Sequence, residues 1–147
     1  MKFVSITLFL FITVIAYYLF ASVTARKPPI GLVDGKLRPC LGKLNCVRSE
    51  DEIKNFVAPF SMPGLTWKEI RTAIENTGGA IQRHEQNHLW AEYTSTVFRF
   101  VDDLEIRFDE ETETYHVRSS SRSGIKDFGV NRKRVEALRK QLLKTQF

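Results

Sequence analysis

The chain has 147 residues, of which 43% are hydrophobic and 27% are charged, and 22 bases against 17 acids give a formal net charge of +5. This composition is ordinary for a globular protein, and the length favours one domain with a single core over a multidomain chain. The sequence contains no internal repeats and no low-complexity tract, which excludes repeat and low-complexity architectures.

The charges are unevenly placed along the chain. Residues 102–113 contain seven acids and one base, whereas residues 118–144 contain nine bases and two acids. A basic end favours anionic partners such as phosphate groups or an acidic membrane surface. The alternative is that the two blocks neutralise each other across one folded domain.

Residues 3–25 carry no charge, and residues 3–23 are almost wholly apolar. A run of about 20 such residues can cross a membrane as a helix, and it is longer than the apolar region of most cleaved signals. The small residues Val23, Thr24 and Ala25 nevertheless offer a cleavage point before Arg26. We therefore assign residues 1–25 to an N-terminal membrane anchor or a signal peptide.

The position of this segment at the extreme N-terminus favours export of the rest of the chain, to the periplasm or cell envelope. The bases that come after the apolar run favour a cytoplasmic domain by the positive-inside rule. The cysteine pair decides for export, because two cysteines in an exported chain most simply form a disulfide. Cys40 and Cys46 would close a short loop; free thiols and a metal or redox role are the alternatives, although two thiols are too few ligands for zinc.

Residues 26–48 are rich in proline and glycine and are predicted to form a linker with the cysteine loop. The domain proper is assigned to residues 49–147. Thr66 and Glu69 match a capping box, which predicts a helix from Thr66 to the Gly78-Gly79 pair. A second helix is expected to begin near Asn131.

Alternation of apolar and polar residues predicts strands over residues 80–84, 88–97, 103–108 and 114–120. Polar turns separate these strands, so they form an antiparallel sheet whose apolar face packs on the helices. The predicted fold is α+β: a sheet of about four strands, a preceding helix, a C-terminal helix, and the N-terminal hydrophobic helix.

Several separated motifs carry a family resemblance: Cys40 with residues 45–47, then residues 100–105, 117–124 and 127–132. In this order they resemble the family catalogued as domain of unknown function 1499, over roughly Leu37 to Leu143. Leu44 and Arg48 stand where members often have proline and serine. The resemblance implies a family without implying an activity.

The acids of the 100–105 motif have three interpretations. Asp102 and Asp103 are adjacent, so in a strand they point to opposite faces and cannot form a paired acid and base. Asp103 and Glu105 share a face, where they would form ion pairs with Arg118 or Arg122 of the neighbouring strand. Weak cation binding and general acid–base chemistry are the alternatives.

Arg118, Ser120 and Arg122 also share one face of a strand, and two guanidinium groups beside a hydroxyl suit a phosphate or carboxylate. The next loop leads to the helix start at Asn131 and Arg132, where free amides favour anions. These five residues form the candidate ligand site. The alternative is internal bracing. The acids that would then pair with the arginines are Asp102, Asp103, Glu105 and Asp127.

No catalytic set, metal site or cofactor motif is recognised. Ser120 and Ser121 lack a nucleophile-elbow context, His84 and His88 are separated by a turn, and no phosphate-binding glycine loop occurs. The leading hypothesis is a non-catalytic envelope module that binds an anionic lipid headgroup or an acidic protein segment. A structural or assembly factor is second and an unrecognised enzyme third. Export disfavours nucleic acid, and the sequence gives no signal of oligomeric state.

Overall fold

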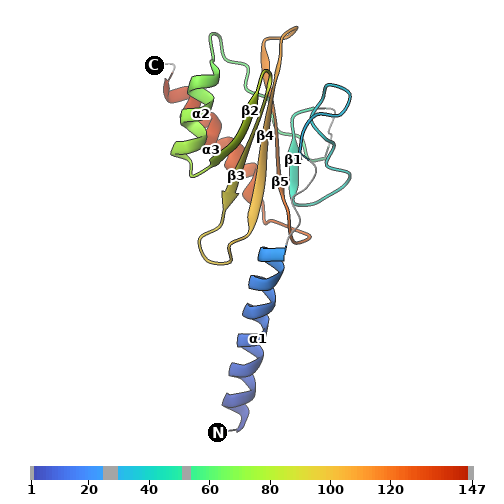
Figure 1. The fold of residues 1–147 in the computed structure, drawn as a ribbon, viewed down its shortest axis with the longest axis vertical. Coiled ribbons are helices and arrows are strands. Elements are labelled where there is room, and N and C mark those ends of the chain that lie inside the picture. Colours follow the sequence, from blue (N-terminus) through green and yellow to red (C-terminus); the bar gives the residue numbers. More distant parts are fainter. Residues whose placement is uncertain (1, 25–29, 51–53, 146–147) are drawn as a thin grey trace.

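The computed structural model describes residues 2–24, 30–50 and 54–145. Within these ranges the chain forms three helices and one five-stranded antiparallel sheet (Figure 1). The elements are α1 (Lys2–Thr24), β1 (Cys46–Arg48), α2 (Trp67–Asn76), β2 (Ala80–Glu85), β3 (His88–Thr94), β4 (Val101–Asp109), β5 (Thr114–Ser121) and α3 (Val130–Thr145). The predicted α+β class is confirmed, with α2 before the long strands and α3 after them.

The strand order is β1-β5-β4-β3-β2. The last four strands are those that alternation predicts, whereas β1 lies in the segment that we assigned to the cysteine loop. It pairs with the last strand, with Cys46 opposite Ser120 and Arg48 opposite Arg118. A strand of three residues is too short to show an alternating pattern. It is therefore recognised from its pairing with β5 and not from its sequence.

One face of the sheet, the helix face, is covered by α2 and α3 (Figure 1). Leu104, Ile106 and Val117 point from the sheet into this core and are fully buried. They pack in one cluster with Ile70 and Ile74 of α2 and with Val135, Leu138 and Leu142 of α3. Each such buried side chain contributes roughly 1.5–3 kcal/mol through loss of apolar surface from water.

The start of α2 has the local geometry that its sequence predicts. The Thr66 hydroxyl accepts a hydrogen bond from the Glu69 amide, and the Glu69 carboxylate accepts one from the Thr66 amide. Both donors would otherwise be unpaired at the first turn. The capping box therefore fixes where α2 begins and how its apolar side meets the sheet.

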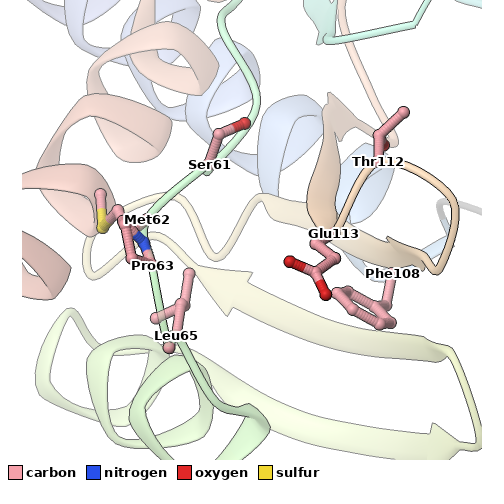
Figure 2. Close-up of a pocket in the computed structure, with 8 residues that line it drawn as sticks. Ser61, Met62, Pro63, Leu65, Phe108, Thr112 and Glu113 are labelled. Atoms are coloured by element: carbon pink, nitrogen blue, oxygen red, sulfur yellow. The ribbon is translucent and has the colours of Figure 1, made fainter.

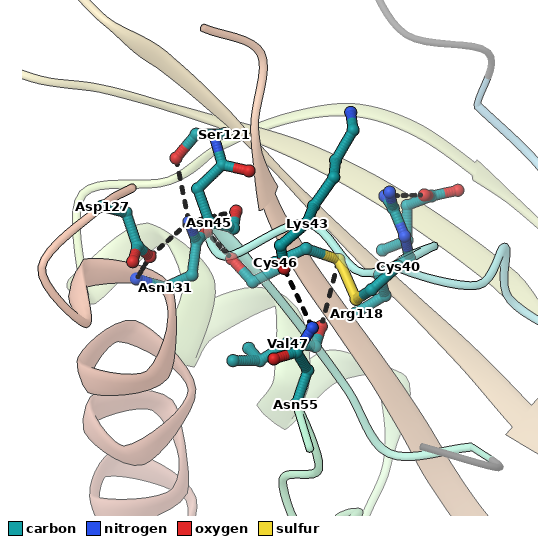
Figure 3. The surroundings of a disulfide bond; sticks show 12 residues. Cys40, Lys43, Asn45, Cys46, Val47, Asn55, Arg118, Ser121, Asp127 and Asn131 are labelled. Atoms are coloured by element: carbon teal, nitrogen blue, oxygen red, sulfur yellow. Dashed lines mark hydrogen bonds and ion pairs between the residues drawn. A yellow bond between two sulfur atoms is a disulfide. The ribbon is translucent and has the colours of Figure 1, made fainter. Parts of the chain in front are cut away.

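The opposite face, the arm face, is covered by residues 30–45, which we call the arm. Leu37 and Cys40 of the arm are buried, and the Leu37 amide donates to the carboxylate of Glu50. The predicted disulfide between Cys40 and Cys46 is confirmed, with an S–S distance of 2.06 Å (Figure 3). It ties the arm to β1 and so keeps it against the sheet.

Helix α1 extends from the end of the domain at which β4 begins (Figure 1). Tyr18 contacts the rings of Phe98 and Phe100, with centroid distances of 6.3 and 6.2 Å. No helix built from the described residues is long and apolar enough to cross a membrane. The predicted cleavage point between Ala25 and Arg26 lies outside the described residues.

Candidate functional site

The arm face carries a buried network of charged side chains, which we call the charged face. Alternation along the strands puts one set of residues on this side of the sheet. They are His88, Trp90 and Glu92 of β3, Asp103, Glu105 and Arg107 of β4, Arg118 and Ser120 of β5, and Arg48 of β1. A charge that is buried in this way needs a partner of opposite sign.

Glu105 lies at the centre of the charged face and is fully buried. Its carboxylate accepts hydrogen bonds from Arg118 Nη1 at 3.1 Å and from the Gly31 amide at 3.0 Å, and its Oε2 lies 3.1 Å from His88 Nε2. Burial on its own would raise the pKa of Glu105, but these partners outweigh it and lower the pKa. Glu105 is therefore held as a carboxylate.

Asp103, also fully buried, forms a second centre. Its two oxygens accept from Arg122 Nε at 2.9 Å and Arg122 Nη2 at 2.7 Å, a bidentate pair, while Trp90 Nε1 donates at 2.9 Å. Arg122 also contacts the carboxylate of Glu92. Hydrogen bonds to Asp103 raise the pKa of the Arg122 guanidinium, so this group is permanently charged and fully engaged.

A third centre joins the arm to β4. Glu50 accepts from the Leu37 amide at 2.7 Å, from Arg48 Nη2 at 3.1 Å and from Arg107 Nε at 2.7 Å. Arg107 also donates to Asp109 at 2.9 Å, and this contact holds the pKa of Asp109 at about 2. The arm thus closes over the sheet through polar contacts, whereas the helices close over it through apolar ones.

Asn131 lies on the helix face, between β5 and the start of α3 (Figure 3). Its side chain is fully buried; it donates to the Asn45 carbonyl at 3.1 Å and accepts from the Ser119 hydroxyl at 2.6 Å. Asp127 accepts from the Gly129 and Asn131 amides and caps α3. Burial would raise the pKa of Asp127, but these hydrogen bonds lower it.

The structure separates the five residues of the candidate ligand site. Arg118, Ser120 and Arg122 point to the arm face, whereas Asn131 is buried on the helix face and Arg132 is exposed and donates to the Phe56 carbonyl at 2.7 Å. They do not converge on one ligand position.

The four acids predicted to pair with arginines have different partners. Asp103 and Glu105 bind Arg122 and Arg118, and Asp102 pairs with Arg134 at 2.5 Å on the helix side. Asp127, by contrast, binds backbone amides at the start of α3.

Sequence reasoning missed several members of the charged face. They are Arg48 at the end of the predicted linker, Glu50 at the start of the predicted domain, and Glu92 and Arg107 on the polar faces of two predicted strands. The available signal was the composition of that strand face, which combines charges of both signs with Trp90, because a solvated face rarely carries a tryptophan. This composition indicates a buried face only if another segment is known to cover it. The arm covers it, but the arm has no periodic pattern that would predict this.

Two hollows in the surface are large enough to hold a small molecule. The first, of about 410 Å³, lies between residues 61–65 and the end of the β4–β5 hairpin (Figure 2). Its carboxylate, Glu113, is exposed, and the Ser61 hydroxyl lies 3.1 Å from that of Thr114. A hydroxyl without a neighbouring base is not an activated nucleophile. Among the described residues, no group of histidines, cysteines and acids could hold a metal ion.

The second hollow, the end cavity, has a volume of about 560 Å³ and lies where α1 meets the domain. Tyr17 and Tyr18 of α1 form one wall. Phe98 and Phe100 of the β3–β4 turn stack at 5.7 Å and form the second wall. The β5–α3 loop, which includes Phe128, forms the third. The cavity is thus bordered by aromatic rings from three separate segments.

A family model described as a protein of unknown function, DUF1499, matches residues 36–142 of the chain. This range includes all five strands, α2 and most of α3, and begins within the arm. The description names no activity. No curated protein matches the chain.

Proposed function

Because this chain belongs to the DUF1499 family, whose description names no activity, we propose a function from its geometry. We infer that it is a non-catalytic module held at a lipid surface, in which the charged face braces the domain. This joins two hypotheses that the sequence raises: attachment to a membrane, and a structural role for the acids and arginines.

The observation that carries the proposal is a surface of exposed apolar side chains at the α1 end of the domain, which we call the apolar end. Its members are Val97, Phe98, Ile125, Phe128 and Val130, and Ile125 and Phe128 are 83% and 81% exposed. Soluble proteins rarely leave large apolar side chains clustered in water. Two exposed bases, Arg99 and Lys126, lie in the same loops, where acidic headgroups would attract them.

Helix α1 extends this apolar surface. Its described side chains include exposed phenylalanine, leucine and isoleucine residues along its length, such as Phe9, Phe11 and Phe20. The helix meets the domain at the apolar end and not at the opposite one (Figure 1). A lipid phase would cover both surfaces at once, because they are continuous.

The charged face supports the non-catalytic part of the proposal. Glu105, Asp103 and Glu50 each accept at least three hydrogen bonds or ion pairs from neighbouring groups. A general acid or base needs a lone pair or a proton within reach of a substrate. These carboxylates are instead engaged with arginines beneath the arm.

Binding of an anion by Arg118 and Arg122 is the second candidate. It is supported by a single atom, because Arg118 Nε is buried and has no hydrogen-bond partner within the part of the chain that the structure describes. The Arg118→Ala, Arg122→Ala double variant separates the candidates. Bracing predicts loss of folding, because buried Glu105 and Asp103 lose their counter-charges. Anion binding predicts a folded variant that phosphate or acidic lipid no longer stabilises, whereas they do stabilise the parent.

Contact of the apolar end with lipid can be measured directly. Both native cysteines are bonded in the disulfide, so a single introduced cysteine can carry an environment-sensitive fluorophore. We would label Ile125→Cys and Phe128→Cys in the full chain, reconstitute each in vesicles with acidic lipid, and quench with brominated lipids. The control is Glu111→Cys, in the turn at the opposite end of β4.

The proposal expects strong quenching at positions 125 and 128 and weak quenching at position 111. Equal quenching at all three positions, or none at 125 and 128, would refute it.

A further inference from the structure

The end cavity is shaped for an apolar chain. Its volume of about 560 Å³ falls within the range of small-molecule sites, roughly 300–1,000 Å³. Tyr18, Phe98 and Phe100 form an aromatic cluster on one side, and Ile125, Phe128 and Val130 lie on the other. Sites of this kind bind the apolar part of a ligand by burial and orient it by a few polar groups.

The loop that forms the third wall is held in place by hydrogen bonds. Asn45 Nδ2 donates to the carbonyls of Ser123 and Gly124, at 3.1 and 2.8 Å. Asn131 Nδ2 donates to the Ser121 hydroxyl at 2.9 Å. The cavity is therefore pre-formed on its domain side and needs no ordering of this loop to receive a ligand.

The polar end of the cavity suits a neutral acceptor better than a free ion. Asp102 is paired with Arg134, and Asp127 is engaged by the first amides of α3. Lys126 is exposed and lies 5.8 Å from the centre of the Phe128 ring. Both carboxylates at this end are thus engaged by groups of the protein itself.

One hydroxyl at this end has no hydrogen-bond partner among the described residues. Ser123 is one of the residues that line the cavity, and its hydroxyl oxygen is buried. An unpaired buried hydroxyl is costly, and native proteins pair nearly all of them. A ligand carbonyl in the cavity would accept a hydrogen bond from this hydroxyl.

We propose that the end cavity binds one acyl chain of a bilayer lipid, whose ester carbonyl accepts a hydrogen bond from Ser123. This inference rests on the proposed lipid-surface function. The path of entry favours a bilayer lipid, because the exposed apolar side chains of α1 run from Ile6 to Tyr17 and Tyr18 at the cavity wall. A chain that lies along this helix reaches the cavity without crossing water.

The test uses the full chain in vesicles that contain a phospholipid with a nitroxide near the end of one acyl chain. Electron paramagnetic resonance then separates mobile lipid from lipid held by the protein. The inference expects an immobilised component that saturates at one lipid per chain. Lipid that only surrounds α1 would not saturate in this way.

Two variants and a control test where that lipid is bound. Val130→Trp places a large ring at the cavity and should abolish the saturable component. Ser123→Ala removes only the donor and should weaken binding by about fivefold, the usual value of one hydrogen bond. Val97→Trp adds the same ring to the apolar end at a residue that does not line the cavity, and should leave the component unchanged.

Val130 is half-exposed at the first position of α3, so we expect this variant to fold, and its thermal midpoint checks that it does. If Val130→Trp does not fold, the Ser123→Ala variant still tests whether the lipid is bound in the cavity. An immobilised component that persists in Val130→Trp, that is lost equally in Val97→Trp, or that never saturates would overturn the inference.

The two proposals fail differently. If labels at Ile125 and Phe128 are quenched by lipid but no saturable component appears, the cavity inference is wrong and the surface proposal stands. If those labels are not quenched, both are wrong.

Discussion

Replacement of Asp103 by asparagine tests the charged face at its most buried pair. Asparagine keeps the shape of the side chain but removes its charge and one of its two acceptor oxygens. In the parent, those oxygens accept two hydrogen bonds from Arg122 and one from Trp90. The Asp103→Asn variant therefore leaves a buried guanidinium with Glu92 as its remaining carboxylate contact, and breaks the bidentate pair.

The expected cost depends on burial. Removal of one partner of a buried ion pair destabilises a protein by about 3–5 kcal/mol, a large part of the roughly 5–15 kcal/mol that holds a domain together. Glu92→Gln is the matched control, because it removes the other carboxylate of the same arginine, with a side chain that is 18% exposed. A pair that is partly in water contributes about 0–1 kcal/mol.

The free energy of unfolding would be measured by urea titration of the full chain in a mild detergent, monitored by tryptophan fluorescence. The reasoning is wrong if Asp103→Asn costs no more than Glu92→Gln, or less than about 1 kcal/mol. The Asp103→Asn, Arg122→Met double variant supplies a further check. It should cost less than the sum of the single substitutions by about 0.5–3 kcal/mol, because it removes both charges of the Asp103–Arg122 pair together.

Three further predictions concern the arm, the core and pH. Replacement of Cys40 and Cys46 by serine should lower stability by about 2 kcal/mol in a urea titration and speed amide exchange in the arm, since the arm loses its tie to β1; unchanged exchange would contradict this. Leu138→Ala should cost about 2–5 kcal/mol in the same titration, because this side chain is fully buried between α3 and the sheet; a cost under about 1 kcal/mol would contradict the packing. Burial lowers the pKa of His116 below its usual 6.5, so the unfolded chain binds more protons, and stability present at neutral pH is lost as the pH falls below 6.5. The His116→Gln variant should show a shallower loss between pH 7 and pH 5, and an identical slope would refute the assignment.

The local signals in the sequence predict much of the fold. Thr66 and Glu69 give the start of α2, alternation gives β2 to β5, and the spacing of Val135, Leu138 and Leu142 gives the buried side of α3. The placement of Cys40 and Cys46 six positions apart in one short loop predicts the disulfide. Each of these features depends on residues that are close in the chain, which is why the sequence reveals them.

The rest of the site depends on contacts between distant segments. Glu105 meets the Gly31 amide across 74 positions, and Arg107 meets Glu50 across 57. The sequence of the arm contains no periodic pattern that predicts packing against a sheet. Its contacts are therefore known only from the structure. The predicted ligand site failed to converge for a similar reason: Asn131 approaches β5 from the helix face, opposite to Arg118 and Arg122.

The two faces of the sheet should accumulate substitutions in different ways over evolutionary time. On the helix face, Leu104 or Ile106 can be exchanged for another apolar residue of similar volume at a cost usually below about 1.5 kcal/mol, so such positions drift singly. On the charged face, loss of the acid at Asp103 removes the ion-pair partner of Arg122. Loss of Glu105 does the same to Arg118. Changes there should be inherited jointly, so that lineages that lose one partner also lose the other.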